Sequence, residues 1–200
     1  MPITTPFTEL EAVNEMLMAI GQAPVNALAG IGDVNMALAE LRKVVRAVQL
    51  YGFAFNTDAD YPITPDIDGK LLVPSGVLKI GPSDKNLRLV QRRHPAGPLA
   101  MWDTVNHTWA FSGPVYFRVT WGFGFEDMPE TARNYIAVRA ARRFQARTIG
   151  STELDRYNQE DEDAAWATLF RDELSSSDKN IFRSNPSMRR YANRSGRTRV

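Results

Sequence analysis

The chain has 200 residues, 44% hydrophobic and 24% charged, which is typical of a soluble globular protein with one domain, or one domain carrying a small second module. The absence of cysteine excludes disulfides, thiolate metal sites and thiol nucleophiles, and it fits a reducing cytoplasm. A formal net charge of +1 does not indicate a general nucleic-acid binder, and the sequence shows neither a signal peptide nor an apolar run long enough to span a membrane.

Two amphipathic helices open the predicted fold. Residues 8–20 form the first helix, because Thr8 and Glu11 have the spacing of a capping box and apolar residues recur at helical spacing. The second helix is expected from about residue 34 to residue 50, with Asp33 or Asn35 as its N-cap. Its apolar stripe consists of Leu38, Leu41, Val44, Val45 and Val48.

Residues 52–126 are rich in proline, glycine and aromatic side chains, and they predict a small irregular β module. The strand-like pieces are KLLVP, GVLKIGP, NLRLVQRR, PLAMWD, HTWAF and PVYFRVTWGF. Alternation from Val115 to Trp121 indicates a half-buried sheet. The sequence DTVNHT is typical of a hairpin turn.

Two further helices follow the β module. The third begins near residue 127, with Asp127 as the expected N-cap, and Gly150 ends it. Its expected buried face contains Ala132, Tyr135, Ile136, Ala140 and Phe144. The fourth begins at Ser151 or Thr152 and ends near residue 176. Its apolar residues are Leu154, Tyr157, Ala164, Ala165, Leu169 and Phe170.

This order of elements predicts an α+β protein with a C-terminal tail. An antiparallel helical bundle of residues 8–51 and 127–177 would hold the inserted β module of residues 52–126, and residues 178–200 would form a flexible, Arg-rich tail. Residues 151–177 carry eight acids against two arginines, whereas the tail carries one acid against one lysine and six arginines. Adjacent segments of opposite charge indicate contacts with a partner, including other copies of the chain.

Four aspartates in the stretch GFAFNTDADYPITPDIDG suggest a calcium loop, but their spacing is wrong for one. They are Asp58, Asp60, Asp66 and Asp68. An EF-hand loop needs ligands at positions 1, 3 and 5 and glycine at position 6, whereas a loop starting at Asp58 has Pro62 and Ile63 at positions 5 and 6. We therefore expect no metal or other cofactor, and we interpret this stretch as a stiff surface loop for docking.

Other catalytic constellations are weak. His94 and His107 are thirteen residues apart in turn-like settings, which does not suit a metal pair, although His107 with Asp103 remains conceivable as a general base. A glycosidase-like carboxylate pair could come from Asp58, Asp60, Glu126 or Asp127. The motifs GxSxG, HExxH and GxxxxGK[ST] do not occur. The residues favour a protein that is not an enzyme.

An arginine stripe follows the third helix. Arg139, Arg143 and Arg147 recur every four residues, and Arg142 lies beside them. The simpler interpretation is a solvated face paired with acids of the fourth helix; the alternatives are an acidic partner or nucleic-acid phosphates. In an assembly, the arginines and the acidic run of the fourth helix would pair between subunits. That run is Glu160, Asp161, Glu162 and Asp163.

Several phrases of the sequence, taken together, resemble a known family. They are ELEAVNEMLMAIGQAPVNAL, VVRAVQLYGFAFNTD, LLVP, FEDMPETARNYIAVRAARRFQARTIGS and YNQEDEDAAWATLFRDEL. In this order, over roughly residues 8–175, the chain resembles the tail tubular protein A family of T7-like short-tailed bacteriophages. The tail past Asp178 is outside the resemblance.

The resemblance implies a structural role in the virion tail. Members of that family form a twelve-subunit adaptor ring between the capsid portal and the nozzle protein, tail tubular protein B, with tail fibres attached nearby. The ring encloses the channel for genomic DNA, which would pass without sequence-specific binding. Assembly would take place in the bacterial host cytoplasm, and no membrane contact is implied.

Three sets of docking residues follow from this interpretation. The four aspartates would contact a subunit or fibre, and the arginine stripe with the acidic run would join subunits. The tail arginines would bind the portal or a neighbouring subunit; they are Arg183, Arg189, Arg190, Arg194, Arg197 and Arg199. The rival predictions are a tail-associated cell-wall or polysaccharide hydrolase that uses Asp58, Asp60 or Asp66, and a DNA-binding module that uses Arg139 and Arg143.

Overall fold

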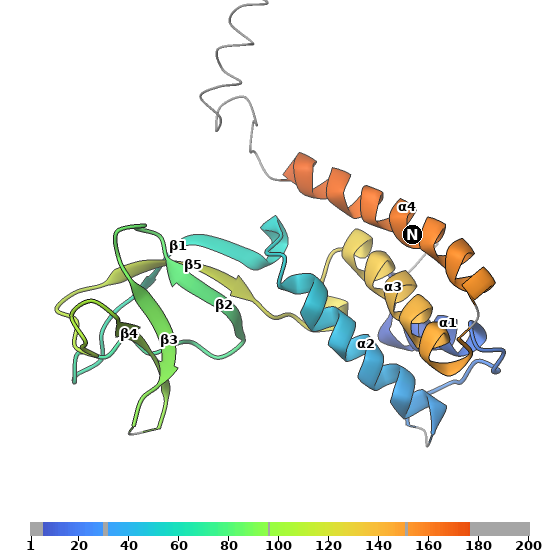
Figure 1. Ribbon diagram of the computed structural model, residues 1–200, viewed down its shortest axis with the longest axis horizontal. Helices are drawn as coiled ribbons and strands as arrows, with labels where there is room; N and C mark the ends of the chain where they lie inside the picture. Colours follow the sequence, from blue (N-terminus) through green and yellow to red (C-terminus); the bar gives the residue numbers. More distant parts are fainter. Residues whose placement is uncertain (1–5, 30–31, 96, 151, 177–200) are drawn as a thin grey trace, which may run out of the picture.

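The predicted α+β class is confirmed. A computed structural model describes residues 6–29, 32–95, 97–150 and 152–176 of the chain. Over these residues the helices gather at one end of the long axis and the strands at the other (Figure 1). The chain leaves the helices after α2, builds both sheets, and returns to the helices through β5 and a short 3-10 turn. The predicted tail, residues 178–200, lies outside the described residues.

The first two helices form as their apolar spacing predicts. Helix α1 spans Glu9–Met18, and the capping box is present: Thr8 Oγ1 accepts a hydrogen bond from the Glu11 backbone N–H, while the Glu11 carboxylate accepts one from the Thr8 backbone N–H. Helix α2 spans Asp33–Gln49 and buries the valines of its predicted stripe. Its N-cap is Gly32, at φ 76°, so the predicted caps Asp33 and Asn35 are wrong.

Helices α3 (Glu130–Thr148) and α4 (Thr152–Ser176) complete the bundle. The predicted buried face of α3 is confirmed, and it packs against α1, α2 and α4. Asp127 lies in a 3-10 turn, Phe125–Asp127, and Pro129 occupies the N-cap position of α3, so the predicted Asp127 cap is wrong. On α4, Ala165 and Leu169 are buried, but Tyr157 and Phe170 are exposed; the predicted Leu154 side chain lies outside the described residues.

Two small antiparallel sheets form the other end of the molecule. The three-stranded sheet has the order β1-β5-β2, with β1 at Thr57–Ile63, β5 at Val115–Trp121 and β2 at Val77–Pro82. The two-stranded sheet pairs β3 (Leu89–Arg93) with β4 (Leu99–Asp103). Their buried side chains make a core separate from that of the bundle: Ile63, Leu71, Leu89, Met101, Phe117 and Val119.

The aspartate-rich stretch is not simply a surface loop, because residues 57–63 form strand β1. The sequence did not predict this strand, because aspartate and proline are uncommon in β-strands. Pro62 is tolerated because β1 is an edge strand, which leaves one side of its backbone free of partners. The pairing with β5 shifts register between Asp58 and Tyr61, and Asp60 takes φ 57° there, so a bulge accommodates the extra residue.

Of the six predicted strand pieces, four form strands and two do not. GVLKIGP, NLRLVQRR, PLAMWD and PVYFRVTWGF each contain a strand. KLLVP and HTWAF contribute only isolated bridges, Leu72 to Ala100 and Thr108 to Asp103. The predicted DTVNHT turn is confirmed, since the Asp103 carboxylate accepts hydrogen bonds from the backbone N–H groups of Val105 and Asn106.

Two buried amides join the helical part to the sheet part. Gln49 at the end of α2 is 1% exposed; its Nε2 donates to the Phe123 carbonyl at 3.0 Å, and its Oε1 accepts from the Phe123 N–H at 2.7 Å. Asn56 Nδ2 donates to the carbonyls of Gln49 and Trp121 at 3.0 and 2.8 Å. These bonds fix the direction in which β5 returns to the bundle.

Replacing Gln49 with leucine should lower the free energy of unfolding by about 1–3 kcal/mol, because the Phe123 N–H and carbonyl lose their partners. Chemical denaturation followed by circular dichroism measures this. Gln91→Leu is the matched control, since Gln91 is exposed on β3, and it should change stability by no more than about 0.5 kcal/mol. Equal effects of the two changes would contradict a structural role for Gln49.

Candidate functional site

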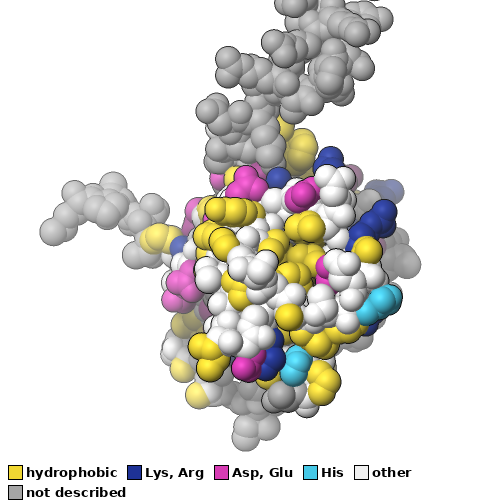
Figure 2. Space-filling model, turned by 90° about the vertical axis from the view of Figure 1, so that its left-hand side faces the viewer, with side chains coloured by type: hydrophobic (Ala, Val, Ile, Leu, Met, Phe, Trp, Pro, Cys, Tyr) yellow, Lys and Arg dark blue, Asp and Glu magenta, His cyan; other side chains and the backbone are white. Residues whose placement is uncertain are grey.

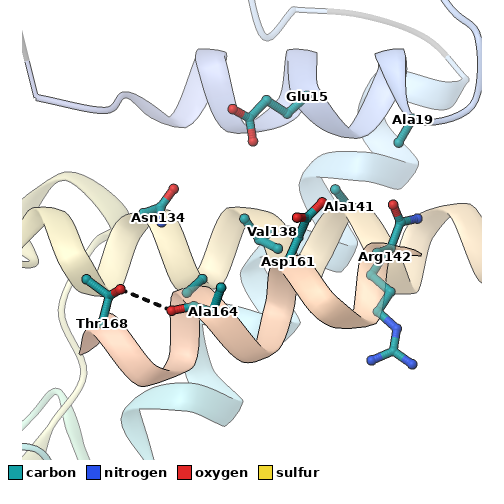
Figure 3. A pocket seen from close by; sticks show the side chains of 11 residues that line it. Glu15, Ala19, Asn134, Val138, Ala141, Arg142, Asp161, Ala164 and Thr168 are labelled. Carbon is teal, nitrogen blue, oxygen red and sulfur yellow. Dashed lines mark hydrogen bonds between the residues drawn. The ribbon is translucent and has the colours of Figure 1, made fainter. Parts of the chain in front are cut away.

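A groove lies between α1 and α4, and residues of α3 also line it. Its volume is about 470 Å³, and small apolar residues such as Ala19, Ala141 and Ala165 line it. Figure 3 shows Glu15 on α1 across the groove from Asp161 on α4, with Val138 of α3 beside Asp161. The lining combines these small apolar residues with charged ones, Glu15, Arg142 and Asp161.

Burial changes the titration of Glu15 in this groove. Desolvation, and then the nearby Glu11 carboxylate, raise the pKa of Glu15 above its ordinary value of 4.5. Because the folded pKa is higher than the unfolded one, ionised Glu15 destabilises the fold above the folded pKa, and this penalty disappears below the unfolded pKa.

Glu15→Gln should therefore raise the free energy of unfolding near neutral pH and leave it unchanged below pH 4.5, where glutamate is protonated in both states. Denaturation curves across a pH series measure the difference. The control Glu160→Gln alters an exposed glutamate of α4 and should show no such pH-dependent gain. A gain for Glu15→Gln that persists at low pH would show that charge is not its cause.

Part of the arginine stripe pairs with α4 inside the chain, as the simpler interpretation predicts. Arg142 Nε lies 2.7 Å from Asp155 Oδ1, and its Nη1 lies 3.1 Å from Glu162 Oε2. Arg139 Nε lies 3.6 Å from Glu162 Oε1. Hydrogen bonds from Arg142 lower the pKa of Asp155, so this network stabilises α3 against α4 at neutral pH.

The other two stripe arginines have a partner that the sequence did not indicate. Glu40 of α2 is 3% exposed, and it accepts Arg143 Nε at 2.9 Å and Arg147 Nη1 on its two carboxylate oxygens. Lys43 Nζ lies 3.7 Å from the same carboxylate. Charge-assisted bonds of this kind hold α2 against the C-terminal half of α3.

Three acids of the predicted charge-pairing set have no ion pair within the part of the chain that the structure describes. They are Glu160, Asp161 and Asp163, all exposed on α4. Glu162, in contrast, faces Arg139 and Arg142. Pairing of this set between subunits stays a prediction. Glu160, Asp161 and Asp163 are the members that have no ion pair in the described structure.

The aspartates of residues 58–68 are separated into different local settings. Asp58 Oδ2 accepts a hydrogen bond from Trp121 Nε1 at 2.8 Å. Asp66 Oδ1 accepts from the backbone N–H groups of Asp68 and Lys70, and so it closes a turn. Asp68 pairs with Lys70 Nζ at 2.8 Å, which lowers the Asp68 pKa. Asp60 is exposed at the bulge. Their docking role stays a prediction.

A second hollow, which we call the basic pocket, lies where the three-stranded sheet meets the end of α2. Its volume is about 400 Å³. Three exposed cations line it, Lys79 of β2, Lys85 after β2 and Arg118 of β5, together with one acid, Asp60. Tyr51, 62% exposed, stands on its rim. Sequence reasoning missed this pocket, because its cations are far apart in the chain.

The free end of the sheet part carries aromatic and apolar side chains. Trp102 and Trp109 lie with ring centroids 4.8 Å apart, His94 packs edge-on to Trp109, and the Arg92 guanidinium lies over Trp102. Figure 2, which faces this end, shows hydrophobic side chains gathered over its middle and the histidines at the margin. The ring centroids of His107 and Trp102 are 6.3 Å apart, so both histidines belong to this aromatic cluster.

The other predicted candidates are placed as follows. Within the described ranges no group of three or more histidine, aspartate or glutamate side chains has metal-binding geometry, and no helix is long and apolar enough to cross a membrane. Asp103 caps its own turn. Glu126 accepts a hydrogen bond from the Glu9 N–H at 3.5 Å. The six tail arginines predicted to bind the portal lie outside the described residues.

Comparison with known proteins identifies the family. The family model described as tail tubular protein matches residues 10–179, a range that includes both the helices and the sheets. Tail tubular protein A of Klebsiella phage KP34 is 27% identical over 130 residues, which cover 64% of this chain and 67% of that protein. The chain belongs to the tail tubular protein family.

Proposed function

We propose that the chain is the adaptor subunit of a short phage tail, and that twelve copies form a ring between the capsid portal and the nozzle protein. The observation that carries this proposal is the family match over residues 10–179, which covers every helix and strand of the described fold except the first residue of α1. In this proposal the ring lines the DNA channel, the tail fibres attach nearby, and the subunit is made and assembled in the host cytoplasm.

The distribution of surfaces supports an assembly role. We infer that residues 8–51 and 127–177 act as a helical domain facing the portal, and that residues 52–126 act as an inserted β domain facing the nozzle or fibres. The α1–α4 groove lies on the helical part and the aromatic cluster on the sheet part. Two separate candidate interaction surfaces suit a subunit that binds two different partners.

The arginines of α3 give little support to a DNA-binding function. Arg142 is held by Asp155 and Glu162, and Arg143 and Arg147 are held by Glu40. Phosphate binding would have to break these pairs. We therefore propose that DNA passes through the ring without tight binding. We also propose that the chain has no enzymatic activity.

The mass of the purified full chain, alone and mixed with the portal of its phage, tests the proposal. We expect a ring, or a monomer that joins the portal in twelvefold stoichiometry. A chain that stays monomeric and ignores the portal would contradict it. Turnover of a cell-wall polymer that is lost in Asp58→Asn would instead support the hydrolase alternative.

A further inference from the structure

We propose that the basic pocket of one copy receives the exposed acidic face of α4 from a second copy. This inference rests on the proposed ring and names the surfaces that would join its subunits. A ring needs a heterologous contact, in which one patch of the subunit meets a different patch of the next. The chain must therefore carry two complementary surfaces on different elements. The candidates are the basic pocket on the sheet part and the exposed acids of α4.

The charges of the basic pocket are not matched inside the chain. Over the described residues, no ion pair joins Lys79, Lys85 or Arg118 to an acid, and Asp60 is the one acid in the lining. The pocket therefore has an excess of positive charge. An exposed tyrosine on the rim, Tyr51, adds a residue type that often anchors protein interfaces.

The acids of α4 whose side chains the structure describes, Asp155 to Glu173, divide into two groups. Four have partners: Asp155 and Glu162 pair with Arg142, Asp172 Oδ2 accepts from Thr131 Oγ1, and the Glu173 carboxylate accepts from the Ala54 N–H. The three without an ion pair in the described structure fall within four consecutive positions, at Glu160, Asp161 and Asp163. Glu160 and Asp163 are three positions apart and therefore share one exposed face of the helix, which we call the acidic ridge, whereas Asp161 lies on another face and lines the α1–α4 groove. The acidic ridge has the sign of charge that the basic pocket fits.

One chain does not bring these two surfaces together. Figure 1 shows the sheets at one end of the molecule, and the first half of α4, with the acidic ridge, toward the other end. A second copy therefore has to supply the acids. DNA phosphates would also be attracted to the pocket, but the near-neutral net charge and the matching acids on the same chain favour the second copy.

A charge swap in the full chain tests the contact. Lys79→Glu with Arg118→Glu makes the pocket acidic, and Glu160→Lys with Asp163→Lys makes the ridge basic. Each pair alone should reduce the assembled fraction by about tenfold or more, because like charges then face each other, whereas the combined variant should regain most of it. Sedimentation velocity measures assembly, on the portal complex if the chain alone is monomeric. Arg46→Glu with Arg88→Glu, an equal charge change on exposed residues outside the pocket, should assemble normally.

Each outcome decides the proposal. Recovery in the combined variant supports the contact and shows that the variants fold. If wild type assembles but the pocket variant assembles equally well, or the combination fails to recover, the contact is overturned while the ring stands. Loss of salt-sensitive duplex DNA binding with normal assembly would assign the pocket to nucleic acid and overturn the contact. A wild type that assembles neither alone nor on the portal would overturn both proposals.

Discussion

Replacing Arg143 and Arg147 together with alanine should lower the free energy of unfolding by about 3 kcal/mol, the scale expected when a buried charge loses its partners. The Glu40 side chain is 4% exposed, and both of its carboxylate oxygens are bound by these two arginines. Only Lys43, 3.7 Å away, would remain beside it. Urea denaturation of the wild type and the variant measures the loss.

The charge explanation has a direct control. Glu40→Leu added to the double-arginine variant should recover most of the stability, because an apolar side chain of similar size has no charge to desolvate. Arg46→Ala, an exposed arginine of α2, should change stability by no more than about 0.5 kcal/mol. A triple variant as unstable as the double variant would show that lost packing of the arginine stems, not the stranded carboxylate, is the cause.

Replacing Phe117 with alanine should lower the free energy of unfolding of the sheet part by about 3–5 kcal/mol, the usual cost of truncating a buried phenylalanine. Phe117 lies on β5, the central strand of its sheet, and is 0% exposed in the core formed with Val119 and Met101. Tyr116→Ala, on the exposed face of the same strand at 53% exposure, should cost far less.

The same variant tests the proposed division into two domains. The two cores share no residue. If residues 52–126 are a domain, the Phe117→Ala variant should lose protection of sheet amides from hydrogen exchange at lower denaturant than protection of α2 and α3 amides. Loss of both signals at the same denaturant concentration would mean that the two parts unfold as one unit.

The sequence predicted those features that depend on neighbouring residues. The Thr8–Glu11 capping box, the stripes of α2 and α3, and the alternation of β5 are local patterns, and each was confirmed. Strand β1 was missed because its pairing with β5 outweighs the poor β propensity of its acids and proline. The N-cap residues of α2 and α3 were wrongly predicted, because Gly32 and Pro129 occupy those positions and neither helix has a side-chain cap.

The candidate surfaces were less predictable, because their residues are distant in the chain. Glu40 meets Arg143 and Arg147 across more than 100 positions, and nothing in the local sequence marks that pairing. The basic pocket combines residues that follow α2 with residues of β1, β2 and β5 in the same way. Burial along α4 was also predicted only in part. Phe170 stacks on Trp166 and is exposed, whereas the neighbouring Leu169 is buried.

The place of the chain in the virion tests the adaptor account most directly. Electron microscopy of purified virions, with the chain located by its helices and its two sheets, shows where it lies and how many copies surround the channel. The account predicts a ring of twelve copies between portal and nozzle, with the sheet part toward the nozzle or fibres. Absence of the chain from the tail, or its presence as single copies away from the portal, would contradict the account.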